Sequence, residues 1–203
     1  MKFYNSVGPN PRMVRMFMAE KGITIPTQDV NLMKGENREG EHLMRNPHGQ
    51  MPALELDNGA FLSEITAICE YLEDKNPKPA LIGGTAEEKA ETRMWTRRID
   101  LNICEPMANG FRFSQGLPLF QSRIVTVPEA ADGLKKIAQD RIKWLDGQMA
   151  GKQYVVGNRF TLADILLFSF LDFGGQVGQP LNPEFNNVTV WFNRMKDRPS
   201  TKA

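Results

Sequence analysis

The sequence predicts two consecutive domains, a small α/β domain followed by an all-helical one. Strand-like and helix-like stretches alternate over the first third of the 203 residues. Residues 76–79 then include two prolines, which cannot continue a helix, and strand signals nearly vanish beyond them. We therefore expect an α/β domain over residues 1–76, a linker over 77–86 and an all-helical domain over 87–203.

The first predicted elements are a strand, a turn and a helix. Residues 2–6 form a β-prone run, and the apolar residues within 13–18 recur at helical spacing. Asn10 fits the N-cap position of this helix and Pro11 its first helical position. The sequence therefore predicts that the helix starts immediately after the strand and a short Gly-Pro turn.

A second strand, a hairpin and another helix complete the first domain. Val30 and Leu32 indicate the strand, and residues 54–62 consist of two apolar stretches joined by Asn-Gly, the strongest short hairpin signal. Ser63 can cap the helix that follows, whose apolar positions share one face: Ile65, Ile68 and Leu72.

Helical patterns dominate the second domain. Residues 85–88, T-A-E-E, form a capping box that opens a long helix reaching Ile103, and a further helical pattern covers residues 134–149. Thr161 and Asp164 form another capping box. The nearly continuous apolar run that follows it is typical of a helix at the centre of a bundle.

The composition excludes several classes of function. The chain has 25 Lys and Arg residues and 24 Asp and Glu residues, which gives a net charge of +1. This charge supplies almost none of the counterion release on which nucleic-acid binding depends. The two Cys and two His residues lack the paired spacing of a zinc site. No run is apolar enough for a signal peptide or a membrane helix. We expect a cytoplasmic protein without a metal, a nucleic-acid partner or a membrane partner.

Three motifs, spread over both predicted domains, carry a resemblance to a known family. They are N-P-H-G-Q-M-P-A-L at residues 46–54, L-S-E-I-T-A-I with Y-L at residues 62–72, and F-T-L-A-D at residues 160–164. Together they resemble the cytosolic glutathione transferases, with some features of the bacterial nu and beta classes. The resemblance implies a thioredoxin-like N-terminal domain and an all-α C-terminal domain, the glutathione transferase fold.

The first two motifs imply a binding site for glutathione. In the family the proline here numbered Pro52 is cis, which a prolyl bond adopts at a cost of only about 0.5–1 kcal/mol. Its predecessor, Met51, then pairs with the cysteinyl backbone of glutathione as an added strand would. Glu64 and Ile65 open a helix whose N–H groups suit the γ-glutamyl carboxylate, while Glu64 can receive the ammonium group. Ile65 replaces the usual serine, so we expect weaker carboxylate binding, for which Thr66 or Ser63 can compensate.

Further residues of the glutathione site are implied by the same resemblance. Gln50 and Lys34 resemble positions that reach the glycyl carboxylate of glutathione, and Asn37 falls where some classes use a histidine. Taken alone, Lys34 reads as a solvated loop charge. His48 has no role in the family and reads as a surface residue.

The family also requires a group that holds the glutathione sulfur as a thiolate. Asn10 matches the asparagine of the nu class, Tyr4 aligns with the tyrosine of the tyrosine-type classes, and Ser6 ends the first strand. We rank Asn10 first, Tyr4 second and Ser6 third, with little separation. Gly8 occupies the place of the catalytic serine of other classes. No cysteine stands at the expected position, so the nucleophile has to arrive with glutathione, a cosubstrate, and no tightly bound cofactor is implied.

The expected function is that of a glutathione-dependent transferase or peroxidase that presents glutathione thiolate to a hydrophobic electrophile in detoxification. Met107, Phe111 and Phe113 are candidates for the second-substrate pocket, although core packing explains them equally well. Family members are commonly homodimers. Two alternatives remain open: a glutathione-dependent disulfide reductase, and a non-catalytic binding or scaffold protein.

Overall fold

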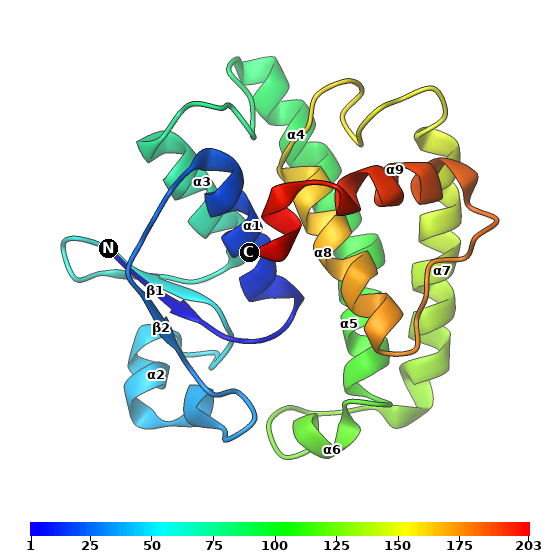
Figure 1. Ribbon diagram of the computed structural model, residues 1–203. Coiled ribbons are helices and arrows are strands. Elements are labelled where there is room, and N and C mark those ends of the chain that lie inside the picture. The colour runs from blue at the N-terminus through cyan, green and yellow to red at the C-terminus, as the bar shows by residue number, and fades with distance from the viewer. The chain divides into compact units, whose positions relative to one another are not determined.

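The structure is a computed structural model that describes all 203 residues, and the chain divides into two units. The first contains Met1–Ala80 together with Lys202–Ala203, and the second contains Leu81–Thr201. Figure 1 traces the chain from the strands near the N-terminus into the helices of the second unit. No helix combines the length and the apolar character that crossing a membrane requires.

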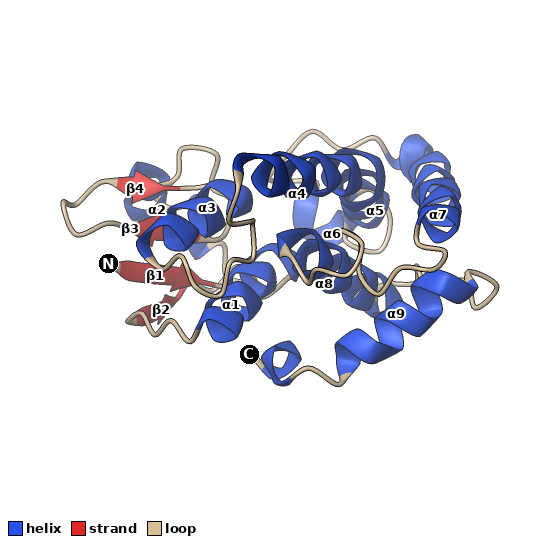
Figure 2. Ribbon diagram, turned by 90° about the horizontal axis from the view of Figure 1, so that it is seen from above, coloured by secondary structure: helices blue, strands red, loops and turns tan.

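A four-stranded mixed sheet organises the first unit. Its strands are β1 (Lys2–Asn5), β2 (Thr27–Asp29), β3 (Ala53–Glu55) and β4 (Phe61–Leu62), in the order β2-β1-β3-β4. Strand β1 runs parallel to β2 and antiparallel to β3, which is antiparallel to β4. Figure 2 shows the strands in red.

Three helices accompany the sheet: α1 (Pro9–Lys21), α2 (Gly40–Arg45) and α3 (Ile65–Lys75), with a 3₁₀ turn, η1 (Glu36–Arg38), before α2. In Figure 1, α1 and α3 lie on one side of the strands and α2 on the other. Alternation along β1 explains this arrangement, because Phe3 and Tyr4 are both buried and point to opposite faces of the sheet. The sheet is thus covered by helices on both faces.

Several element boundaries in the first unit differ from the sequence-based expectations. Helix α1 begins at Pro9, with Gly8 as its N-cap, so Asn10 lies in the first turn and is not the N-cap. Gly8 has a φ of 108°, a conformation that glycine adopts without strain, and this allows the helix to start earlier. The N-cap of α3 is Glu64 and not Ser63.

The strands also differ in extent. The second strand is Thr27–Asp29, just before Val30, whose N–H still donates to the carbonyl of Asn5 at 2.8 Å. Val30 itself belongs to a buried cluster, with Leu32 packed against it. The hairpin turn is longer than two residues: the N–H of Leu56 donates to the carbonyl of Ala60 at 2.8 Å. Residues 56–60 therefore form the loop, which contains the expected Asn-Gly.

The second unit is helical, as expected. Its longer helices are α4 (Ala86–Ile99), α5 (Glu105–Arg112), α7 (Ala131–Gln148), α8 (Leu162–Gln176) and α9 (Asn186–Lys196). A π-helical segment, η2 (Asp100–Cys104), joins α4 to α5, so the helical run expected to reach Ile103 continues beyond it. Shorter elements are α6 (Leu117–Phe120), η3 (Pro128–Ala130) and η4 (Pro199–Lys202). Residues 161–171 are all buried, which makes α8 the central helix.

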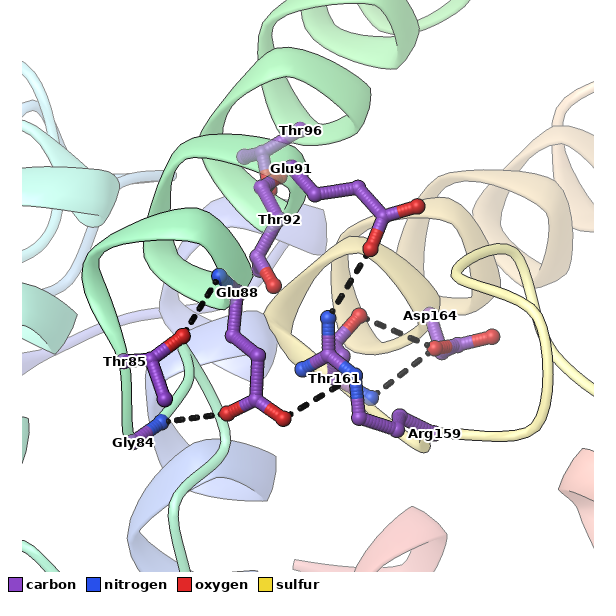
Figure 3. A network of polar contacts seen from close by, with 9 residues as sticks. All are labelled: Gly84, Thr85, Glu88, Glu91, Thr92, Thr96, Arg159, Thr161 and Asp164. Atoms are coloured by element: carbon purple, nitrogen blue, oxygen red, sulfur yellow. Dashed lines mark hydrogen bonds and ion pairs between the residues drawn. The ribbon is translucent and has the colours of Figure 1, made fainter.

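The expected capping box at the start of α8 is confirmed, and Figure 3 shows Thr161 beside Asp164. The box belongs to a larger buried network. The Asp164 carboxylate accepts hydrogen bonds from the N–H and hydroxyl of Thr161, the N–H of Val155 and the indole N–H of Trp191. Burial raises the pKa of Asp164 to about 6, although these four hydrogen bonds act in the opposite direction. One carboxylate therefore joins α8, α9 and the segment before α8.

Candidate functional site

Three chain segments meet at one end of the sheet in the first unit. Tyr4 of β1 pairs with Ala53 of β3, and Leu54 of β3 pairs with Leu62 of β4, both antiparallel. The C-terminal ends of β1 and β4 therefore lie beside the N-terminal end of β3. Helix α1 begins soon after β1, and α3 soon after β4. Two helix starts and the loop before β3 gather at this end.

The residues directly before β3 are Met51 and Pro52, and the peptide bond between them is cis, as the motif predicts. The Met51 side chain is buried in a cluster with Tyr4, Val30 and Ala53. Its backbone lies outside the β1–β3 ladder, which extends only to Ala53. An extended ligand can therefore pair with the Met51 backbone and lengthen the sheet.

The residues expected near a glycyl carboxylate have different environments. Lys34 is exposed and Gln50 is half-buried. Asn37 is only 3% exposed and donates its Nδ2 to the carbonyl of Gly49 at 2.6 Å. Its amide group therefore supports the loop before Met51 from inside the protein.

The start of α3 has unsatisfied backbone donors. The first intrahelical bond runs from the N–H of Ile68 to the carbonyl of Glu64 at 3.0 Å, and no side chain caps the three N–H groups before it. Glu64 is exposed and has a φ of 65°, the only positive φ outside glycine. Ile65 and Thr66, both half-buried, form the first turn. Such a helix start suits an anion.

The start of α1 offers fewer donors than an ordinary helix. Pro9 and Pro11 have no N–H, and the N–H of Arg12 donates to the Gly8 carbonyl at 3.3 Å. The remaining backbone donor of this turn is the N–H of Asn10. The Asn10 side chain is half-buried and makes no hydrogen bond within the protein, so both its amide groups are available to a ligand.

The other two candidate thiol activators already donate their protons elsewhere. The Tyr4 hydroxyl donates to Glu55 Oε2 at 2.7 Å, and the Arg45 guanidinium lies 4.1 Å from its ring centroid. Burial, followed by the hydrogen bond to Glu55, raises the pKa of Tyr4. The Ser6 hydroxyl donates to the carbonyl of Val30 at 2.7 Å. A thiolate would have to break these bonds to use either group.

Comparison with known proteins agrees with this arrangement. Residues 7–75 match the family model "Glutathione S-transferase, N-terminal domain", and residues 117–199 match "Glutathione S-transferase, C-terminal domain". The chain is 33% identical over 199 residues to "Glutathione S-transferase 2" of Saccharomyces cerevisiae, covering 96% of this chain and 84% of that protein. The chain belongs to the glutathione S-transferase family.

Solved structures of the family share the fold. The crystal structure of Gtt2 from Saccharomyces cerevisiae superposes with a TM-score of 0.93 at 32% identity, covering 100% of this chain and 99% of that one. A glutathione S-transferase domain-containing protein from Marinobacter aquaeolei also gives 0.93, at 30% identity, covering 99% and 100%. The first unit is thus the thioredoxin-like domain of a glutathione S-transferase, and the second is its helical domain.

Neither cysteine of this transferase can take part in thiol chemistry as the structure stands. Cys69 and Cys104 are both free and buried. Burial is the main cause that raises the pKa of each thiol well above its usual value. A buried thiol without a stabilising partner stays protonated and unreactive. No three His, Cys, Asp or Glu side chains are grouped so that they could hold a metal ion.

The three second-substrate candidates differ in accessibility. Met107 is completely buried, and its carbonyl accepts a hydrogen bond from Gln179 Nε2 at 2.9 Å. This environment is that of a packing residue of the helical unit. Phe111 and Phe113 are half-buried. The ring of Phe111 meets two other aromatic rings edge-on, those of Phe120 and Phe173, at centroid distances of 6.0 and 5.1 Å.

His42 and Asn46 are two site residues that the sequence reasoning did not select. Both donate side-chain hydrogen bonds to the carbonyl of Gln50, the residue before Met51. Asn46 is the first residue of the motif at 46–54, and His42 lies outside all three motifs. Because their partner is a backbone carbonyl, no pattern of residue types could have indicated the contact.

Proposed function

We propose that this glutathione S-transferase holds glutathione against the end of its sheet and presents the thiolate to a hydrophobic electrophile. The Met51 backbone pairs with the cysteinyl residue of glutathione, and the first turn of α3 binds the γ-glutamyl carboxylate. Glu64, exposed beside that turn, receives the ammonium group. Lys34 and Gln50 bind the glycyl carboxylate, whereas Asn37 supports the loop before Met51 from inside the protein.

The observation that carries the thiolate assignment is the free amide of Asn10. A thiol with a pKa of about 8.5 needs about 2.7 kcal/mol of differential stabilisation to lower that pKa by two units. A hydrogen bond to a charged group contributes about 1.5–3 kcal/mol, and a helix start about 0.3–1 kcal/mol. One donor at the start of α1 is therefore nearly sufficient. Tyr4 and Ser6 rank below Asn10 because their hydroxyl protons are already donated.

The test is the thiolate absorbance of bound glutathione as a function of pH, in wild type, Asn10→Ala, Tyr4→Phe and Ser6→Ala. We expect wild type to lower the thiol pKa, and Asn10→Ala to raise it again by about one unit. The two hydroxyl variants serve as matched controls that leave it unchanged.

Each contrary outcome identifies a different error. If wild type binds glutathione without lowering the thiol pKa, activation by this mechanism is wrong, and a non-catalytic binding role is favoured. If wild type does not bind glutathione, the whole site assignment fails. If only Tyr4→Phe raises the pKa, Tyr4 is the activating residue and not Asn10.

A glutathione-dependent disulfide reductase is the second candidate function. Asn10 favours it, because an asparagine at this position resembles the nu class. Assays that pair glutathione with a disulfide, a peroxide and an aromatic electrophile separate reductase, peroxidase and transferase activities by their relative kcat/KM. We further propose, from the family resemblance alone, a cytoplasmic homodimer that acts in detoxification; light scattering of the purified protein tests the dimer.

A further inference from the structure

The loop before Met51 is fixed by side chains that donate to three consecutive backbone carbonyls. The 3₁₀ turn η1 supplies two of the donors, α2 supplies one, and the residue directly after α2 supplies one. The contacts are Arg38 Nη1 to His48 O at 3.1 Å, Asn37 Nδ2 to Gly49 O at 2.6 Å, and both His42 Nε2 at 3.0 Å and Asn46 Nδ2 at 2.9 Å to Gln50 O. Gln50 is the only one of the three whose carbonyl receives two side-chain donors.

The two donors to Gln50 are shielded from water. His42 and Asn46 are each 1% exposed, so water does not compete for their N–H groups. The acceptor is a carbonyl, so Nε2 of His42 must carry the proton. Its Nδ1 is buried and has no hydrogen-bond partner, as the neutral tautomer protonated at Nε2 allows.

Peptide geometry connects these donors to the ligand side of Met51. The Gln50 carbonyl and the Met51 N–H belong to one peptide group, which is trans, so the two point in opposite directions. Two donors that hold the carbonyl towards α2 therefore direct the Met51 N–H away from α2. Each donor also polarises the peptide group and strengthens its N–H as a donor.

Gly49 makes this conformation possible. Its φ is 61°, and a Cβ there would lie 2.9 Å from the carbonyl oxygen of Asn37. A larger residue would have to push η1 away from the loop. The glycine of the motif thus brings the loop close enough for the side-chain donors to reach its carbonyls.

We propose that His42 and Asn46 are positioning residues for glutathione: they orient the Gln50–Met51 peptide group so that its N–H meets the cysteinyl carbonyl of the ligand. The proposal rests on the proposed function, because it requires that Met51 bind glutathione through its backbone. Neither residue touches the reacting sulfur. Their loss should weaken glutathione binding and leave thiolate activation unchanged.

The first test uses wild-type protein and needs no substitution. Nitrogen-15 NMR of the histidine side chains distinguishes an imidazole protonated at Nε2 from one protonated at Nδ1. We expect His42 to carry a proton on Nε2. A proton on Nδ1 would remove the donor to Gln50 and overturn the role of His42.

The second test compares His42→Phe, which removes the donor, with His42→Gln, whose amide restores one. Met44→Ala, at a position of the same helix that is 77% exposed, is the matched control. Calorimetry should give a glutathione Kd raised about 3- to 10-fold in His42→Phe, and values near wild type in the other two. The kcat at saturating glutathione should stay within about twofold of the wild-type value. The thiol pKa of bound glutathione should stay within about a few tenths of a unit of the wild-type value.

Three results would contradict the proposal. If wild type binds glutathione and His42→Phe binds it equally well, the positioning role is wrong while the proposed function stands. If His42→Gln loses as much affinity and thermal stability as His42→Phe, the residue acts through packing alone. If wild type does not bind glutathione, the proposed function fails, and this inference fails with it.

Discussion

Two helices of the helical unit, α4 and α8, start differently from α1 and α3 of the thioredoxin-like unit. In the helical unit, Thr85 Oγ1 accepts the N–H of Glu88 at the start of α4, and the Asp164 carboxylate accepts the N–H of Thr161 at the start of α8. In the thioredoxin-like unit, neither α1 nor α3 has a side-chain cap or an acidic residue in its first turn. Backbone donors at the starts of α4 and α8 are thus satisfied by side chains, whereas those at the starts of α1 and α3 are left open.

This difference separates helix starts that stabilise the fold from those that remain available to a ligand. A side-chain cap contributes about 1 kcal/mol to stability. Helices α1 and α3 begin at the same end of the sheet, beside the cis Met51–Pro52 bond. In the proposed complex, these donors bind the thiolate and the γ-glutamyl carboxylate of glutathione.

The largest expected effect comes from removing the most extensive cap. Asp164→Ala leaves the buried donors of Val155, Thr161 and Trp191 without an acceptor. We expect the free energy of unfolding to fall by about 3–5 kcal/mol. Urea denaturation measures it, with the exposed Asp140→Ala on α7 as a control that changes it by less than about 0.5 kcal/mol. A loss below about 1 kcal/mol for Asp164→Ala would contradict the importance of this cap.

The second expected effect is a pH dependence of the same carboxylate. Burial raises the pKa of Asp164 to about 6, above the value of about 3.9 for an unfolded chain. Between these values the folded protein binds more protons than the unfolded one, so the unfolding free energy falls as the pH rises. The stability that protonated Asp164 contributes is fully present below about pH 4 and is lost above about pH 6. Relative to Asp164→Asn, which does not titrate, the free energy of unfolding of wild type should fall by about 3 kcal/mol across this window. Equal pH profiles for the two proteins would show that the pKa is not raised.

The smallest expected effect on stability concerns the uncapped start of α3. Glu64→Gly relieves the positive φ of 65° and should raise the unfolding free energy by about 0.5–1 kcal/mol. It should also weaken glutathione binding, because the carboxylate that receives the ammonium is lost. Glu64→Gln is the matched control, with weaker binding and unchanged stability. A Glu64→Gly protein that is less stable than wild type would contradict the strain argument, and unchanged binding in both variants would remove Glu64 from the site.

Signals between residues close in sequence predicted much of the fold. The Thr161–Asp164 capping box and the cis bond at Pro52 are both confirmed. The start of α1 was predicted incorrectly, because Pro9 and Pro11 both suit a first turn. The conformation of Gly8 selects the earlier start, and residue identity alone does not reveal that conformation.

The order of the two domains, the family, and the motif that places Met51 and Pro52 before a strand can all be read from the amino-acid sequence. Which hydrogen-bond donors are free depends on the folded chain. The Tyr4 hydroxyl is bonded to a carboxylate 51 residues away, and the Ser6 hydroxyl to a carbonyl 24 residues away. His42 likewise acts on a backbone carbonyl. Such bonds join groups that only the folded chain brings together. A backbone carbonyl accepts in the same way whatever side chain its residue carries, so a bond to it leaves no pattern of residue types in the sequence.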